Sequence, residues 1–206
     1  AIASYQNALK LDPNLAEALN GLGVCLREKQ LIDQAVECFQ RACALKPTLA
    51  DAPCNLGMAL RDQALLPESV AALRRASQHP DSTVRRRAAM TLGRIGDRGG
   101  VPMLLELLQD RDTLVQLEAL FALGEIGDAS AAPELIRQAA LPQTAGQHGV
   151  ELVTALAKMG GPAADTALVR LLQRFPPTPE GNDVVAAAGA EAAAAERQVA
   201  SSTAPW

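Results

Sequence analysis

The stretch LGRIGDRGGVP, residues 92–102, occurs a second time as LGEIGDASAAP, residues 123–133. Leucine, glycine, isoleucine, aspartate and proline return at the same places, 31 positions apart. Self-similarity at a fixed period of this length is typical of proteins built from stacked helical units. The repeated phrase therefore predicts the architecture of the chain before any single residue points to a function.

The residues before each phrase predict a helix with one apolar face. Apolar residues recur there at intervals of four, four and three positions, which places them on one side of a helix. In the first copy these residues are Val84, Ala88, Leu92 and Ile95, and in the second copy they are Val115, Ala119, Leu123 and Ile126.

Glycine and aspartate in the phrase are expected to form a turn between two helices. A glycine can adopt the left-handed conformation that ends a helix, and an aspartate beside it can accept hydrogen bonds from backbone amides. Pro102 and Pro133 suit the first turn of the helix that follows. The residues expected to build the two turns are Gly93, Gly96, Asp97, Gly124, Gly127 and Asp128.

A different period, 34 residues, organises the first part of the chain. The pattern Leu-Gly-x-x-Leu at residues 22–26 recurs at 56–60, and Ala42 recurs as Ala76. These residues resemble the tetratricopeptide repeat, a pair of antiparallel helices. The resemblance covers residues 1–80 as a half repeat followed by two whole ones, so we expect the natural N-terminus to lie upstream.

The 31-residue pattern resembles the HEAT-like repeats of phycobilin lyases and of many adaptor proteins. It covers residues 81–175 in two clear copies and a degenerate third, which a Pro- and Gly-rich insertion, LPQTAGQHG, precedes. Residues 176–206 have few large apolar side chains and are expected to be a flexible tail. We predict an all-α fold, a right-handed α-α superhelix or solenoid of tetratricopeptide pairs followed by HEAT-like pairs.

Composition restricts the possible partners. The chain has 206 residues, of which 49% are hydrophobic, enough for a sizeable core. Its net charge of −4 offers no general attraction to nucleic acid, which we therefore disfavour as a partner. There is no apolar run long enough for a membrane span and no export signal in the sequence. We expect no membrane association and a cytoplasmic location.

The sequence contains no recognisable catalytic, cofactor-binding or metal-binding motif. His79 and His148 have no evident partners. The four cysteines have spacings that fit neither a zinc site nor a compact disulfide framework, so we expect small buried hydrophobic residues, with a metal site as the alternative. We predict a protein that is not an enzyme and carries no cofactor.

The resemblance to phycobilin lyases leaves an enzyme alternative, a factor that handles open-chain tetrapyrroles or their apoproteins. A chromophore cleft usually contains aromatic side chains, but only 2% of this chain is aromatic. We expect those residues mostly at core or tail positions, and they are Tyr5, Phe39, Phe121, Phe175 and Trp206.

The tetratricopeptide resemblance implies that the first helix of each pair lines a groove. Asn20 and Arg27 should face this groove in one repeat, and Met58 and Arg61 in the next. The arginines either contact a bound peptide or form salt bridges within and between repeats. The stretch DAPCNLGMALRDQ also resembles the repeats of O-linked N-acetylglucosamine transferases, in which an asparagine at the place of Asn55 contacts the substrate backbone.

Seven arginines gather where the two repeat types meet, namely Arg74, Arg75, Arg85, Arg86, Arg87, Arg94 and Arg98. Arg85, Arg86 and Arg87 form the densest run and could contact phosphate or an acidic peptide. The alternative, which we favour, is that Arg85 bonds to a turn carboxylate, Asp110 or Asp128, and that the others are solvated. We predict a non-catalytic scaffold or adaptor whose partner is a protein or peptide.

Overall fold

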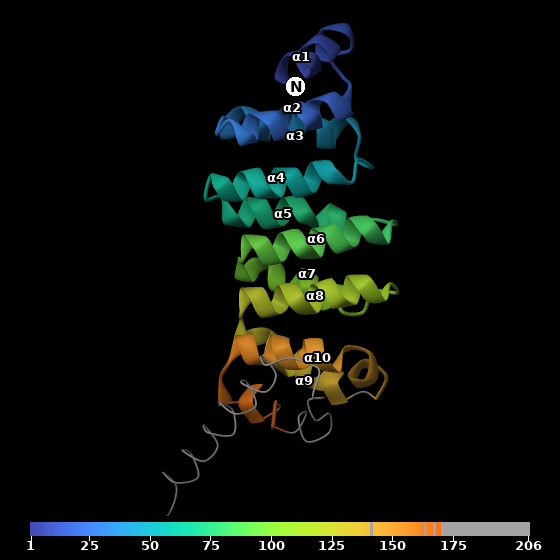
Figure 1. The fold of residues 1–206 in the computed structure, drawn as a ribbon, viewed down its shortest axis with the longest axis vertical. Coiled ribbons are helices and arrows are strands. Elements are labelled where there is room, and N and C mark those ends of the chain that lie inside the picture. The colour runs from blue at the N-terminus through green and yellow to red at the C-terminus, as the bar shows by residue number, and fades with distance from the viewer. Residues whose placement is uncertain (141, 163, 167, 170–206) are drawn as a thin grey trace, which may run out of the picture.

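The structure is a computed structural model that describes residues 1–140, 142–162, 164–166 and 168–169. Paired helices stack in chain order into one elongated solenoid (Figure 1). Every regular element of the described residues is helical, which confirms the predicted all-α solenoid. No helix among them is both long and apolar enough to cross a bilayer. The expected tail, residues 176–206, lies outside the described residues.

The first part of the stack is one lone helix followed by two antiparallel pairs. Each pair packs against the next in chain order. The helices are α1 (Ile2–Leu11), α2 (Ala16–Glu28), α3 (Ile32–Leu45), α4 (Asp51–Asp62) and α5 (Leu66–Ser77).

Glycines allow the two helices of these pairs to approach closely. A Cβ atom on Gly23 would lie 2.6 Å from the Phe39 ring, and one on Gly57 would lie 3.3 Å from Leu73 Cγ. Phe39 and Leu73 are both fully buried in the space that the glycines leave. The 34-residue period therefore marks the helix crossings.

The second part consists of longer first helices and shorter second helices. A single 3₁₀ turn precedes each of the second helices α7 and α9. The elements are α6 (Ser82–Ile95), η1 (Arg98–Gly100), α7 (Val101–Leu107), α8 (Thr113–Ile126), η2 (Ala129–Ala131), α9 (Ala132–Ala140) and α10 (Pro142–Met159).

The repeated phrase forms the two helix-ending turns. Gly96 and Gly127 have φ angles of 74° and 65° and end α6 and α8 in the left-handed conformation. Asp97 and Asp128 each accept a hydrogen bond from the backbone amide two residues later, with N···O distances of 2.9 Å. Each turn thereby reverses the chain with its backbone polar groups bonded.

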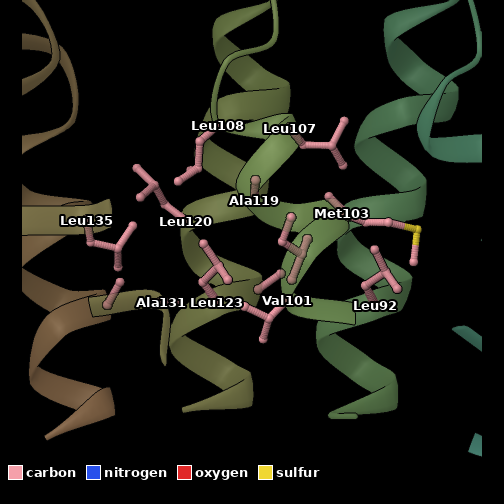
Figure 2. Packing of buried hydrophobic residues seen from close by; sticks show 14 of the residues in the cluster. Leu92, Val101, Met103, Leu107, Leu108, Ala119, Leu120, Leu123, Ala131 and Leu135 are labelled. Carbon is pink, nitrogen blue, oxygen red and sulfur yellow. The ribbon is translucent and has the colours of Figure 1, made fainter. Parts of the chain in front are cut away.

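The largest cluster of buried apolar residues begins in α4 and α5 and continues through the second part of the stack. Leu92, Val101, Met103 and Leu123 fill the space between α6, α7 and α8 (Figure 2). Two smaller clusters, one of which contains Phe39, lie among α2, α3 and α4.

The described part of the insertion before the third HEAT-like copy is helical. Residues 142–149 belong to α10, which kinks at His148 (φ −132°, ψ 22°). Pro142 stands at the first helical position, where its missing N–H is tolerated. His148 is 2% exposed, and its Nε2 lies 3.0 Å from Gln116 Oε1 on α8.

Candidate protein-binding face

The first helices of successive pairs lie side by side along one surface of the stack. In chain order they are α2, α4, α6, α8 and α10, and each contacts the next (Figure 1). We call this surface the first-helix face. All the groove and junction residues singled out in the sequence come from these helices.

Polar side chains on α2 and α4 bond to each other across the repeat boundary. Asn55 Nδ2 donates a hydrogen bond to Asn20 Oδ1 at 3.0 Å. Arg27 Nε donates to Asp62 Oδ2 at 2.6 Å. Two of the predicted groove residues on α2 are thus already partnered by the next repeat.

Arg61 makes a similar connection from α4 to α6. Its Nη1 donates to the carbonyl oxygen of Arg94 at 2.9 Å, and its Nη2 lies 3.3 Å from Asp62 Oδ1. Met58, one turn earlier, is half-buried. Arg27 and Arg61 therefore bond within and between repeats in this structure. Their contact with a bound peptide stays a prediction.

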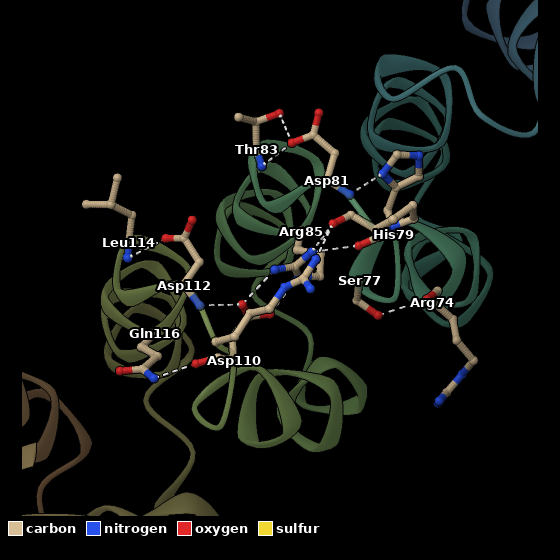
Figure 3. A network of polar contacts seen from close by, with 12 residues as sticks. Arg74, Ser77, His79, Asp81, Thr83, Arg85, Asp110, Asp112, Leu114 and Gln116 are labelled. Atoms are coloured by element: carbon tan, nitrogen blue, oxygen red, sulfur yellow. Dashed lines mark hydrogen bonds and ion pairs between the residues drawn. The ribbon is translucent and has the colours of Figure 1, made fainter.

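Arg85 lies in a buried polar network at the start of α6 (Figure 3). Its Nε and Nη2 donate to the two carboxylate oxygens of Asp110 at 2.6 and 2.7 Å, and its Nη1 donates to the carbonyls of His79 and Pro80 at 2.8 Å each. Both side chains of the ion pair are 7% exposed. Arg85 therefore joins the loop before α6 to the loop after α7.

This network lowers the pKa of its carboxylate. The Arg85 guanidinium holds the pKa of Asp110 below its usual value, assisted by the Asp112 backbone amide. Asp112 in turn caps α8 by accepting a hydrogen bond from the Leu114 amide at 2.9 Å. Of the two carboxylates proposed from sequence, Asp110 is the partner of Arg85.

The other two junction arginines differ in their availability. Arg87 forms an exposed ion pair with Asp51 of α4. Arg86 is exposed, and its side chain makes no hydrogen bond or ion pair within the described part of the chain. Arg86 is therefore the member of the run that is open to a partner.

An exposed apolar stripe lies on α8, which the sequence did not predict. Leu114 and Phe121 are 55% and 56% exposed, and Leu117, between them on the same side of the helix, is half-buried. We call these three residues the α8 patch. The expectation that aromatic residues lie mostly in the core or the tail is wrong for Phe121, because the opposite side of α8 packs on the core.

A hollow of about 470 Å³ lies along the α8 patch. Residues of α6, α8 and α10 line it, namely Arg86, Leu114, Leu117, Glu118, Phe121 and Glu151. Burial raises the pKa of the Glu118 carboxyl, whereas the nearby charges of Arg86 and Arg94 oppose that rise. The hollow thus combines an apolar floor with charges of both signs.

One cation already contacts the aromatic ring of the patch. Lys158 Nζ, on α10, lies 4.9 Å from the centroid of the Phe121 ring. The same ammonium group pairs with Glu125 of α8. These contacts orient the ring while more than half of the side chain stays exposed.

The described residues contain no group of three or more His, Cys, Asp or Glu side chains that could hold a metal ion. Cys54 is buried, and burial raises its pKa to about 11, so its thiol is protonated at neutral pH. Burial also raises the pKa values of Cys38 and Cys43. None of these three cysteines is thereby activated as a nucleophile.

Comparison with family models assigns the chain to a class of repeat protein. The model of HEAT repeats matches residues 55–114, 69–148 and 101–194, which together cover more than half of the chain. The chain belongs to the HEAT-repeat family. Two models of the tetratricopeptide repeat match residues 16–49 and 1–27 of this HEAT-repeat protein. A sequence search of curated proteins finds no match.

The two repeat types meet within the second complete helix pair. The tetratricopeptide matches end at residue 49, and the HEAT match begins at residue 55, inside α4. The 34-residue period nevertheless continues through α4 and α5. The division of this HEAT-repeat protein at residues 80 and 81 stays a prediction, while the α8 patch lies well inside the HEAT match.

Proposed function

We propose that this HEAT-repeat protein is a non-catalytic scaffold that binds a segment of a partner protein on its first-helix face. Tetratricopeptide and HEAT repeats are generally protein-interaction motifs. The observation that carries the proposal is the α8 patch, an exposed apolar stripe beside a hollow that three successive repeats line. The patch is the centre of the proposed site.

The chemistry of the patch suits an amphipathic helix of the partner. Its apolar residues stand at helical spacing and would contact an equally spaced apolar stripe, so that both are removed from water. Arg86 and Glu151 lie at opposite sides of the hollow, on α6 and α10. These charges would set the orientation of the bound helix more than its affinity.

The polar residues of α2 and α4 are less suited to be the centre of such a site. Asn20, Arg27, Asn55 and Arg61 already bond within the fold. A partner would have to replace those bonds, and the exchange of one polar contact for another gains little free energy.

Site-directed photo-crosslinking tests the proposal in the cells that express the protein. A benzoyl-phenylalanine at position 121 should form a discrete adduct with a partner, because the native side chain at this position is an exposed aromatic ring. The matched control places the same group at Glu37, an exposed residue of the second helix α3. Leu114→Ser together with Leu117→Ser should remove the adduct without changing the circular dichroism.

Photo-crosslinking also distinguishes which half of the first-helix face binds the partner. Adducts from position 58 with none from position 121 would move recognition to the groove of α2 and α4. Equal labelling from positions 37, 58 and 121 would show only random encounters and would refute a specific site.

A further inference from the structure

The second complete helix pair has lost side-chain volume at a place that the preceding pair fills. Leu19 is 1% exposed in α2, and the equivalent residue of α4, 34 positions later, is Pro53. Two further residues of the second pair, Ala71 and Ala72, and Cys43 of α3 are also smaller than the residue 34 positions earlier. The equivalent pairs are Leu9 and Cys43, Leu19 and Pro53, Glu37 and Ala71, and Cys38 and Ala72.

These losses coincide with a hollow of about 460 Å³. We call it the Pro53 hollow. Its walls come from α3, α4, α5 and the loop between α3 and α4, so it lies between the second helices of two neighbouring pairs. The residues that line it are Cys43, Pro47, Pro53, Leu56, Ala71, Ala72, Arg74, Arg75 and Gln78.

The hollow has positive charge on its rim and no counter-ion in its lining. The side chains of Arg74 and Arg75 are exposed and make no hydrogen bond or ion pair within the described residues. In the preceding pair the equivalent positions are Gln40 and Arg41, and Arg41 donates a hydrogen bond to the Pro13 carbonyl at 3.1 Å. Arg74 therefore adds a positive charge where the preceding pair has Gln40. Arg75 lacks the backbone contact that Arg41 makes.

The remaining lining residues add no negative charge. None of the described residues that line the hollow is an aspartate or a glutamate. Burial raises the pKa of the Cys43 thiol, so that side chain is neutral at physiological pH. The hollow therefore presents an apolar floor beside two unpaired guanidinium groups, which are effective donors to carboxylates.

We propose that the Pro53 hollow binds an acidic peptide segment of a partner protein. A single apolar side chain enters the space between Pro53, Leu56 and Ala72, and carboxylates on either side of it pair with Arg74 and Arg75. This site uses other helices than the α8 patch and does not rest on the function proposed for that patch. The described lining offers no aromatic ring on which a nucleobase could stack, which favours a peptide over a nucleotide.

Fluorescence anisotropy with a defined peptide tests the proposal on the full chain. The probe is a short fluorescein-labelled peptide with one phenylalanine flanked by two glutamates on each side. Control peptides replace the glutamates by glutamines or the phenylalanine by alanine. We expect saturable binding of the acidic probe that weakens as salt rises, and at least about tenfold weaker binding of either control peptide.

Two kinds of variant identify the site. Arg74→Gln/Arg75→Gln removes the charges, and Pro53→Leu restores the side chain of the preceding copy and fills the hollow. Each should weaken probe binding at least about tenfold. Arg41→Gln, which changes the equivalent arginine of the earlier repeat, is the matched control and should leave binding unchanged.

A further variant guards against a folding defect in Pro53→Leu. Ala71 is exposed, so Ala71→Glu restores the acid of the preceding copy without a packing change, and the new carboxylate stands four residues before Arg75 on α5. This new carboxylate should compete with the glutamates of the probe for Arg75 and so weaken probe binding. Absence of saturable binding to the full chain, or binding that survives both the Ala71→Glu and the Arg74→Gln/Arg75→Gln changes, would overturn the proposal.

Discussion

The two halves of the first-helix face differ in the kind of side chain that they present and in whether it already has a partner. On α2 and α4, polar groups bond to the neighbouring repeat, as Arg27 does to Asp62 at 2.6 Å. On α8, Leu114 and Phe121 each expose more than half of their surface. Apolar area gains free energy when a partner removes it from water, whereas a satisfied polar surface gains little. Similar helix pairs therefore need not contribute equally to binding.

The largest expected contrast is between two phenylalanines, Phe39 on α3 in the first part of the stack and Phe121 on α8 in the second part. Phe39→Ala should lower the free energy of unfolding by about 3–5 kcal/mol, because a fully buried ring is replaced by a cavity. Phe121→Ala should cost at most about 1 kcal/mol, since the exposed ring loses chiefly its contact with Lys158. Urea unfolding followed by circular dichroism measures both. Similar costs for the two variants would contradict the assignment of Phe121 to the surface.

The next effect concerns the buried ion pair at the junction. Arg85→Ala should cost about 3 kcal/mol in urea unfolding, because the Asp110 carboxylate is left buried without its partner. The control is Arg98→Ala, whose side chain is 83% exposed and which should not change the unfolding midpoint measurably. An equally small effect of Arg85→Ala would show that the pair does not hold the two loops together.

Acid should weaken the same contact. Arg85 keeps the pKa of Asp110 in the folded state below the ordinary value of 3.8. The carboxylate therefore contributes stability at pH values above 3.8, and this contribution disappears as pH falls through the lowered pKa. Unfolding free energies measured from about pH 5 down to about pH 2 should fall less steeply for Asp110→Asn than for the natural protein. If the unfolding free energies of both proteins fell equally steeply with pH, the stability would not depend on the ionisation of Asp110.

A smaller effect is expected where helices approach through glycine. In Gly93→Ala the new Cβ would lie 2.9 Å from Ala122 Cβ and 3.0 Å from its Cα, so α8 would have to shift. We expect a cost of about 1–3 kcal/mol by thermal unfolding. In Gly57→Ala the new Cβ would lie 3.3 Å from both Leu73 Cγ and the Ser69 carbonyl oxygen, a longer distance, so this variant should cost less. The reverse order would mean that α6 and α8 adjust more readily than α4 and α5.

The smallest effect belongs to the exposed pair of the N-terminal half. Arg27 and Asp62 are 34% and 24% exposed, so solvent screens their attraction. A double-mutant cycle with Arg27→Ala and Asp62→Ala should give a coupling of about 0.2–1 kcal/mol that declines with added salt. A coupling as large as the cost of Arg85→Ala would remove the contrast between the two ion pairs.

The repeat architecture was predictable because its signals are local. Glycines mark close helix crossings, and the Gly-Asp pairs at residues 96–97 and 127–128 mark turns, so two periods were sufficient to predict stacked helix pairs. The Arg85–Asp110 contact was also foreseen, as one of two alternatives. Helix ends were less predictable, and α10 extends through the insertion that was expected ahead of its helix.

The exposed patch was not predictable for a physical reason. α8 is apolar on nearly all sides, and Leu114, Leu117 and Phe121 satisfy helical spacing as well as the buried stripe that includes Val115 and Leu123. The 31-residue repeat predicts the stripe of Val115 and Leu123 as the core face, and it is buried, but only the packed structure shows that the second stripe stays exposed. Likewise, Pro53 is visible in the sequence as a departure from the repeat, but the hollow depends on residues from three helices at once.

The principal contacts among the described helices join members of one pair or of adjacent pairs. Under tension, the helix pairs of such a chain should detach one at a time from the ends, because no distant contact must break before a terminal pair detaches. A partner that spans α6, α8 and α10 would hold three successive repeats together. Its binding should therefore raise the force required to stretch that segment, so that the protein would be stiffest where it is occupied.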